Sequence, residues 1–137
     1  FFVLNSDSIW VEGVAPPALT RMIETWDASC MDGLLLMASM VTAMGYDGRG
    51  DFVMDRHGRL SRPGENATTP FAYPGVQIVH PRLFADAPRG EFSTNILWDR
   101  AIAARRLFGI SLEGVWIHVG TPEARDEAEA YLARVPV

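Results

Sequence analysis

The apolar residues of this chain follow two kinds of pattern, which predict two kinds of element. Short continuous runs are typical of buried strands and occupy residues 1–4, 33–43, 73–79, 107–112 and 115–119. Shorter runs at 52–54 and around Leu60 flank a predicted hairpin turn at Arg56-His57-Gly58. Apolar residues at i, i+3, i+4 and i+7 predict helices at 16–26 and 94–107. Because strands and helices alternate, the pattern predicts an α/β fold with a mostly parallel sheet.

The predicted helix near the C-terminus has a clear starting signal. Thr121 is suited to cap the helix, Pro122 to occupy its first position, and Glu123 to face the positive end of the helix dipole. By contrast, Asp47-Gly48-Arg49-Gly50-Asp51 and residues 61–70 are rich in turn-forming residues and are predicted loops.

The composition narrows the classes of function. The 137 residues carry a net charge of −5, from 12 basic and 17 acidic residues, which gives no electrostatic basis for binding nucleic acid. No apolar stretch approaches the roughly 20 residues that span a bilayer, and a single cysteine, Cys30, gives no sign of an oxidising compartment. We therefore expect a cytoplasmic protein that binds neither nucleic acid nor membrane.

Ligands of open α/β sheets bind beyond the carboxyl ends of the strands. This rule selects Asn5-Ser6-Asp7, Gly50-Asp51, Tyr73-Pro74-Gly75 and the segment from Trp116 to Thr121. Asp7 is a candidate ligand for a hard cation such as Mg²⁺, which takes oxygen ligands from one or two carboxylates and from phosphate. Asn5 is a candidate partner for a sugar or ribose hydroxyl, although Asn5 and Asp7 could equally form only a turn.

The histidines leave two interpretations open. His118 ends a predicted strand just before a Gly-Thr turn. It is either a metal ligand, although imidazole suits zinc, iron or copper better than magnesium, or a half-buried histidine bonded within the sheet. His57 is expected on the surface and His80 in a structural role. No Gly-x-Ser-x-Gly elbow surrounds a serine, and the chain has no Walker loop or paired Cys-x-x-Cys motif.

Four segments together resemble the sugar-1-phosphate nucleotidyltransferases. They are Phe-Val-Leu-Asn-Ser-Asp at 2–7, Gly-Arg-Gly-Asp-Phe at 48–52, Gly-Val-Gln-Ile-Val-His-Pro at 75–81 and Trp-Ile-His-Val-Gly-Thr at 116–121. They are most similar to the bacterial branch that acts on N-acetylmuramate 1-phosphate with UTP, or on mannose 1-phosphate with GTP. The resemblance implies a Rossmann-like fold and a Mg²⁺-dependent reaction, in which the sugar phosphate attacks the α-phosphorus of a nucleoside triphosphate and pyrophosphate leaves.

The resemblance also implies roles for individual residues. Asp7 matches the catalytic, metal-binding aspartate, and Asn5 and Asp51 match residues that contact the sugar. Gly50 and Gly75 belong to the same substrate-binding segments. His118 stands where the family has a second metal-binding aspartate, so the implied metal pair is Asp7 with His118.

A second departure concerns the length of the chain. The Gly-x-Gly-Thr-Arg loop of the family and its downstream lysine have no match here, since all 12 basic residues are arginines. The chain also opens directly on an apolar strand. We therefore expect residues 1–137 to be the C-terminal part of a single nucleotidyltransferase domain whose N-terminal part is missing, and to be inactive alone. A non-catalytic nucleotide-sugar-binding regulatory protein, or a structural α/β module, remains the alternative.

Overall fold

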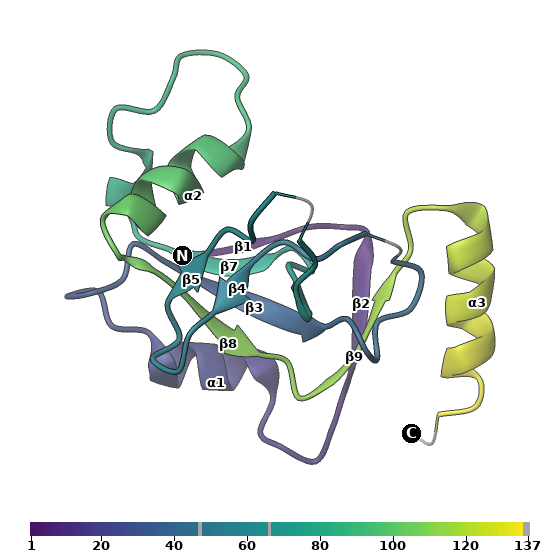
Figure 1. Ribbon diagram of the computed structural model, residues 1–137. Coiled ribbons are helices and arrows are strands. Elements are labelled where there is room, and N and C mark those ends of the chain that lie inside the picture. Colours follow the sequence, from purple (N-terminus) through teal and green to yellow (C-terminus); the bar gives the residue numbers. More distant parts are fainter. Residues whose placement is uncertain (47, 66, 136–137) are drawn as a thin grey trace.

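A five-stranded sheet forms the centre of the computed structural model, which describes residues 1–46, 48–65 and 67–135 (Figure 1). Its strands are β1 (Phe2–Leu4), β3 (Gly33–Ser39), β6 (Phe71–Ala72), β7 (Val76–Val79) and β8 (Leu107–Ser111). The order is β1-β7-β3-β6, and β8 pairs with the other side of β3. Leu34 of β3 pairs with Ile78 of β7 on one side and with Phe108 of β8 on the other.

The sheet is mixed, so the prediction of a mostly parallel sheet was wrong. Of the neighbouring strands in the described residues, only β3 and β8 pair in parallel, whereas β7 is antiparallel to both β1 and β3, and β6 is antiparallel to β3. The reason lies in the connection from β3 to β7, which contains hairpin strands and no α-helix among the described residues. Parallel neighbours require a long crossover, usually a helix, whereas antiparallel neighbours do not.

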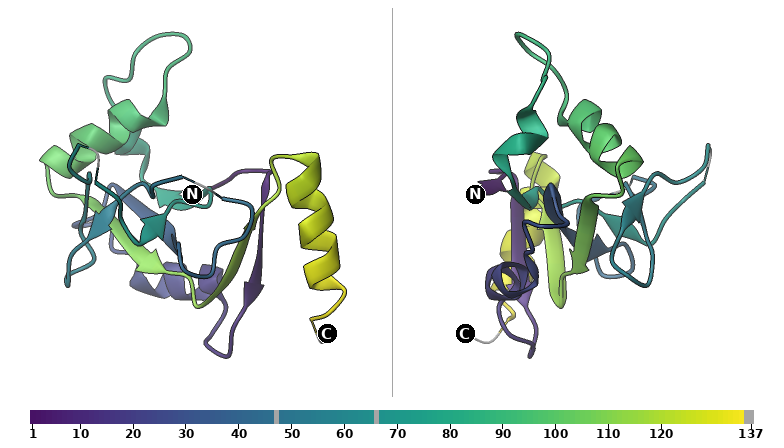
Figure 2. Two further views of the ribbon diagram at one scale, coloured as in Figure 1. Left: turned by 45° about the vertical axis from the view of Figure 1, so that its right-hand side comes forward. Right: turned by 90° about the vertical axis from the view of Figure 1, so that its left-hand side faces the viewer.

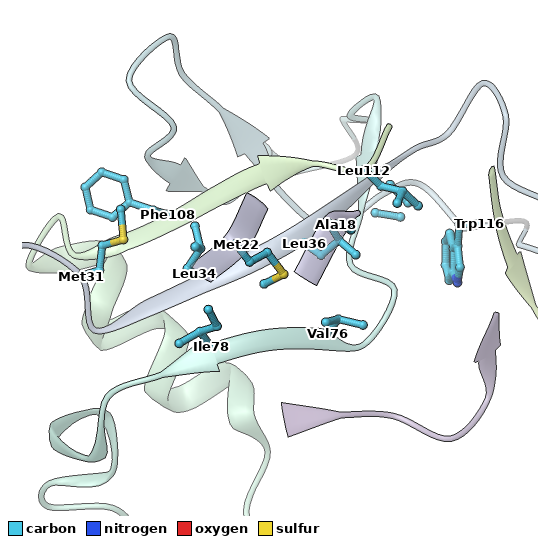
Figure 3. Close-up of a cluster of buried hydrophobic side chains, with 12 residues drawn as sticks. Ala18, Met22, Met31, Leu34, Leu36, Val76, Ile78, Phe108, Leu112 and Trp116 are labelled. Carbon is cyan, nitrogen blue, oxygen red and sulfur yellow. The ribbon is translucent and has the colours of Figure 1, made fainter. Parts of the chain in front are cut away.

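Helices cover both faces of the sheet, as the continuous apolar run of β3 requires. Alternate residues of β3 point to opposite sides, so Leu34 and Leu36 share a cluster with Met22 of α1 (Ala18–Thr25). Leu35 and Met37 pack instead with α2 (Thr94–Ala103). Figure 2 shows the two helices on opposite sides of the sheet, and Figure 3 shows Met22 among the side chains of the first cluster.

A separate two-stranded ribbon lies beside the central sheet. It pairs β2 (Ser8–Glu12) with β9 (Gly114–His118) and is followed by α3 (Pro122–Leu132) on its outer side (Figure 1). The strand β2 was not predicted. Its apolar residues, Ile9, Trp10 and Val11, form a run of only three between polar neighbours. Among the described residues, no helix is both long and apolar enough to cross a membrane.

The remaining elements refine the sequence predictions. The hairpin is confirmed as β4 (Val53–Met54) and β5 (Leu60–Ser61), and η1 (Pro81–Phe84) is a short 3-10 helix that was not predicted. The strand predicted at 33–43 ends at Ser39, the one predicted at 73–79 begins at Val76, and the helix predicted at 94–107 ends at Ala103. Asp47, in the first predicted loop, and residue 66, in the second, lie outside the described residues.

Candidate active site

A pocket of about 190 Å³ lies where the central sheet meets the ribbon. Its lining comes from both sheets and from the loops between them: Asn5, Asp7, Ser8, Tyr46, Asp51, Tyr73, Pro74, Trp116 and His118. Four of the residues selected from the sequence, Asn5, Asp7, Asp51 and His118, therefore share one pocket although 113 positions separate the first from the last.

The strand directions explain this convergence. Because β1 and β3 are each antiparallel to β7, they run in the same direction, and both end at the edge where β7 begins. Asn5 follows β1 at that edge, and Tyr73 and Pro74 precede β7. The rule that ligands bind beyond the carboxyl ends of strands thus selects the edge at which this pocket lies, although the sheet is mixed.

Asn5 is held against Gly75. The backbone amide of Asn5 donates to the Gly75 carbonyl at 2.7 Å. Gly75 has φ +94°, and a Cβ at this position would come within 2.6 Å of the Asn5 Cβ. Gly75 does not line the pocket itself, so the structure places it behind Asn5, as the residue that lets the Asn5 side chain occupy its position.

The Asp51 side chain is oriented by the backbone of the facing segment. Its amide donates to the Phe71 carbonyl at 2.9 Å, and one carboxylate oxygen, Oδ2, accepts from the Tyr73 amide at 2.8 Å. Gly50 precedes it with φ +85°, where a Cβ would lie 2.6 Å from the Thr69 carbonyl oxygen. Gly50 therefore shapes the loop and, like Gly75, supports a neighbouring polar side chain.

Asp7 and His118 face one another across the end of the ribbon. Asp7 Oδ2 lies 4.0 Å from His118 Nδ1. The backbone supports both residues, since the Val119 amide donates to the Asp7 carbonyl at 2.9 Å and the His118 amide donates to the Met44 carbonyl at 2.8 Å. His118 Nδ1 is buried and has no hydrogen-bond partner among the described residues, so the expectation of a histidine bonded within the sheet does not hold for this ring nitrogen.

The other two histidines lie outside the pocket. His57 is exposed in the β4–β5 turn. His80 Nδ1 accepts from the Arg82 amide at 3.1 Å and caps η1. The surface position predicted for His57 and the structural role predicted for His80 are therefore confirmed.

Aromatic side chains complete the pocket wall: Tyr46 was not selected from the sequence, whereas Trp116 and Tyr73 lie in selected segments but were assigned no role there. The rings of Tyr46 and Trp116 are 5.1 Å apart, and Trp116 Nε1 donates to Ser8 Oγ at 3.0 Å. Burial raises the pKa of Tyr73, only partly opposed by a hydrogen bond with Gln77, so its phenol remains protonated. Tyr73 stands in the Tyr-Pro-Gly segment that was selected, and this was the one available signal for it.

A second, larger pocket of about 430 Å³ adjoins the first, with His118 and Tyr46 lining both. Its outer wall is the first turns of α3, including Thr121, Glu123 and Glu127. His118 therefore lies between two pockets. The smaller one contains polar groups that follow or precede strands, and the larger one is lined by the start of α3.

The pair of Asp7 and His118 fits a divalent cation that takes most of its ligands from elsewhere. Within the described ranges, no group of three or more His, Cys, Asp or Glu side chains could enclose a metal ion. A cation that keeps several waters and binds substrate phosphates needs only one or two protein ligands. The carboxylate and the unpartnered ring nitrogen meet that requirement.

Comparison with solved structures shows a nucleotidyltransferase fold. Over 99% of its length the chain matches 55% of a Bacillus anthracis protein assigned as a glucose-1-phosphate thymidylyltransferase and solved with sucrose (TM-score 0.70, 15% identity). Over 96% of its length it matches 55% of HddC from Yersinia pseudotuberculosis, solved with GMP-PN (TM-score 0.64, 16% identity).

Sequence comparison identifies a related enzyme. The chain is 39% identical over 132 residues to N-acetylmuramate α-1-phosphate uridylyltransferase from Caulobacter vibrioides, which covers 96% of the chain and 54% of that enzyme. No family model matches the chain. The chain is therefore homologous to sugar-1-phosphate nucleotidyltransferases, and it spans about half the length of the relatives that it matches.

Proposed function

We propose that the protein to which this chain belongs joins a sugar 1-phosphate to a nucleoside triphosphate, and that its substrates are N-acetylmuramate 1-phosphate and UTP. The observation that carries the proposal is the convergence of Asn5, Asp7, Asp51 and His118 in one pocket of a chain 39% identical to an N-acetylmuramate α-1-phosphate uridylyltransferase. The reaction would make UDP-N-acetylmuramate, a nucleotide-sugar of cell-wall recycling.

In the proposed reaction an oxygen of the sugar phosphate forms a bond to the α-phosphorus of UTP. The bond from that phosphorus to the bridging oxygen breaks, and pyrophosphate leaves. Such transfers depend mainly on positioning and on neutralising phosphate charge. The net charge of −5 does not attract these substrates, so positive charge must be supplied locally.

The residues of the pocket can position the sugar. Asn5 has an amide that both donates and accepts, which suits a sugar hydroxyl. Asp51 Oδ2 accepts from the Tyr73 amide, and we assign Oδ1 to a second hydroxyl. The rings of Tyr46 and Trp116 provide an apolar wall beside these polar groups. Gly50 and Gly75 act by supporting Asp51 and Asn5.

Asp7 and His118 would hold a divalent cation, expected from the family to be Mg²⁺. When bound, the cation would neutralise charge on the phosphates. The role of the chain is to present one carboxylate and one ring nitrogen, 4.0 Å apart, in the smaller pocket, with His118 also lining the larger one. This arrangement leaves the remaining ligand positions to phosphate oxygens and water.

The proposal is tested by measuring pyrophosphate release by the full-length protein. UTP and GTP are each combined with N-acetylmuramate 1-phosphate, mannose 1-phosphate or glucose 1-phosphate, with a divalent cation present. We expect release to require UTP and N-acetylmuramate 1-phosphate. Asp7→Ala should reduce kcat/KM by at least about a hundredfold, since it removes a charged group at the reacting phosphates.

Other outcomes separate the alternatives. Release with GTP and mannose 1-phosphate would identify a mannose-1-phosphate guanylyltransferase. Binding of a nucleotide-sugar without release from any pair would identify a non-catalytic nucleotide-sugar-binding regulatory protein. Residues 1–137 alone are expected to give no turnover, because all their basic residues are arginines and the family's catalytic lysine has no match.

A further inference from the structure

The metal-binding pair proposed above has mixed chemistry, with one hard oxygen donor, Asp7, and one imidazole nitrogen, His118 Nδ1. Resting on the proposed cation site, we propose that this pair selects a first-row transition-metal dication over Mg²⁺, with Nδ1 as a direct ligand. The cation preference of the protein is then set by its own residues and differs from that of a site with two carboxylates.

The imidazole ring is held with Nδ1 toward Asp7. His118 is the last residue of β9 and pairs with Ser8 in the ribbon, while its amide bonds to Met44 of the neighbouring loop. The opposite edge of the ring packs on Gly120, where a Cβ would come within 2.7 Å of Nε2. The ring of Trp116 lies 5.8 Å away on a further side. Of the described charged groups, these contacts leave Asp7 as the one that Nδ1 faces.

The separation of the two donor atoms suits a shared cation. Metal–nitrogen and metal–oxygen bonds of such ions are about 2.0–2.2 Å, so two ligands of one ion lie at most about 4.3 Å apart. The observed distance is 4.0 Å. Asp7 has 49% of its side chain exposed and can adjust, whereas the less exposed His118, at 32%, is held by its neighbours.

Nδ1 has the features expected of a ligand atom. It is buried and lacks a hydrogen-bond partner within the part of the chain that the structure describes, and a buried polar atom without a partner costs free energy. Among the ion pairs of the described residues, Asp7 is joined only to His118, and no arginine lines the pocket. A cation between the two groups would give the ring nitrogen a partner and neutralise the carboxylate.

The donor set determines which cation is preferred. Mg²⁺ takes oxygen ligands and loses water reluctantly. Imidazole nitrogen favours first-row transition metals, whose affinities rise from Mn²⁺ to Cu²⁺. Mn²⁺ is therefore the most stringent probe, because it is the weakest binder of that series. Its unpaired electrons also report directly on a nitrogen ligand.

The test is Mn²⁺ binding to the full-length protein, with and without UTP, followed by electron paramagnetic resonance and displaced by Mg²⁺. In wild type we expect Mn²⁺ to bind at least about tenfold more tightly than Mg²⁺, and bound Mn²⁺ to show electron spin echo modulation from ¹⁴N. His118→Asp should lower the Mn²⁺/Mg²⁺ preference at least about tenfold and remove the ¹⁴N signal. His57→Asn, which changes an exposed histidine, should alter neither.

The inference is overturned if bound Mn²⁺ shows no ¹⁴N modulation in wild type, or if His118→Asp leaves the preference unchanged. His118→Gln, which keeps a polar side chain without the ring nitrogen, provides a second variant if His118→Asp does not fold. Neither readout requires turnover. A ¹⁴N signal without pyrophosphate release from any substrate pair would therefore support the cation site and reject the transferase.

Discussion

At the residue scale, the positions of polar side chains in the pocket depend on glycine residues that pack against them. Gly75 combines φ +94° with direct contact against Asn5. A left-handed conformation costs a residue with a Cβ about 1–2 kcal/mol, and the added methyl group would also displace the Asn5 side chain. A position outside the pocket thereby controls a residue inside it.

We predict that Gly75→Ala lowers the thermal midpoint of unfolding by a few degrees and raises KM for the sugar phosphate severalfold. Gly64→Ala is a matched control, since an added Cβ at Gly64 meets no described residue within 4 Å and its φ is not positive. Equal effects of the two substitutions on KM would contradict the role assigned to Gly75.

Asp51 gives a prediction that separates the two substrates. Asp51→Asn keeps the size of the side chain and an oxygen that can accept from the Tyr73 amide, but it loses the charge that strengthens a hydrogen bond from a sugar hydroxyl. We expect KM for the sugar phosphate to rise about tenfold, and KM for the nucleoside triphosphate to change little. Steady-state kinetics with each substrate varied in turn provides the measurement.

The sequence was informative about polar residues at strand ends and less so about aromatic ones. Asn5, Asp7, Asp51 and His118 stand in segments that the strand-end rule or the family motifs select. Tyr46 and Trp116 reach the pocket through tertiary packing of a loop on the ribbon. An aromatic side chain in a strand predicts burial equally well whether or not a pocket lies beside it.

At the element scale, α3 is attached mainly through its first turns. Thr121 Oγ1 accepts from the Ala124 amide at 3.1 Å, as the sequence predicted, and Ala124 and Ala128 form its buried face. The small side chains contribute little apolar burial, so the cap supplies a large share of the local stability. The helix also forms the outer wall of the larger pocket.

Thr121→Ala is predicted to destabilise α3 by about 1 kcal/mol, whereas Thr121→Ser, which keeps the capping oxygen, should have a much smaller effect. Amide hydrogen exchange at the start of α3 in the full-length protein measures the difference. Slow exchange in Thr121→Ala, equal to that in wild type, would show that the cap is not limiting.

Element boundaries were predicted best where a capping residue marks them. Thr121 gave the start of α3 correctly, and Ser93 Oγ accepts from the Asn95 amide at the start of α2. The end of β3 at Ser39 has no such marker, because the apolar residues Met40, Val41 and Ala43 continue the run beyond the strand. Tertiary pairing with β6 and β8, both ending near Ser39, determines that boundary.

At the scale of the whole molecule, one ionic cluster joins segments that are far apart in the chain. Asp32 Oδ1 accepts from Arg106 Nε at 2.8 Å and from Arg82 Nε, so the approach to β3 is tied to β8 and η1. Burial raises the pKa of Asp32, but the hydrogen bonds and charges of Arg106 and Arg82 outweigh it, and the pKa of Asp32 is lowered.

This lowered pKa predicts loss of stability in acid. A carboxyl group whose folded-state pKa is depressed stabilises the fold above its unfolded pKa, about 3.9, and loses that contribution as the pH falls through the folded value. We expect Asp32→Asn to reduce the free energy of unfolding at pH 7. Below about pH 4 the free energies of unfolding of the variant and of wild type should become more similar. Denaturant unfolding across this range provides the test, with Asp126→Asn, an exposed carboxylate on α3, as the control.

The whole-molecule architecture was predictable in class but not in strand direction. The continuous apolar residues of β3 correctly predicted a buried strand, which helices cover on both faces. The antiparallel strands depend on the path from β3 to β7, which runs through hairpin material without a helix. The sequence pattern predicted this hairpin, but it did not predict the direction in which the chain returns to the sheet.

The three residues between β1 and β2 have a consequence for how the length of this protein can change. The backbone of Asn5 is hydrogen-bonded to Gly75, just before β7 of the central sheet, and that of Asp7 to Val119, just after β9 of the ribbon. One inserted residue would break one of these bonds or slip β2 by one position, which turns its side chains to the opposite face. Insertions should therefore be tolerated at the exposed residues 88–92. Between Asn5 and Asp7 they should disrupt the pocket, because its geometry requires this number of residues.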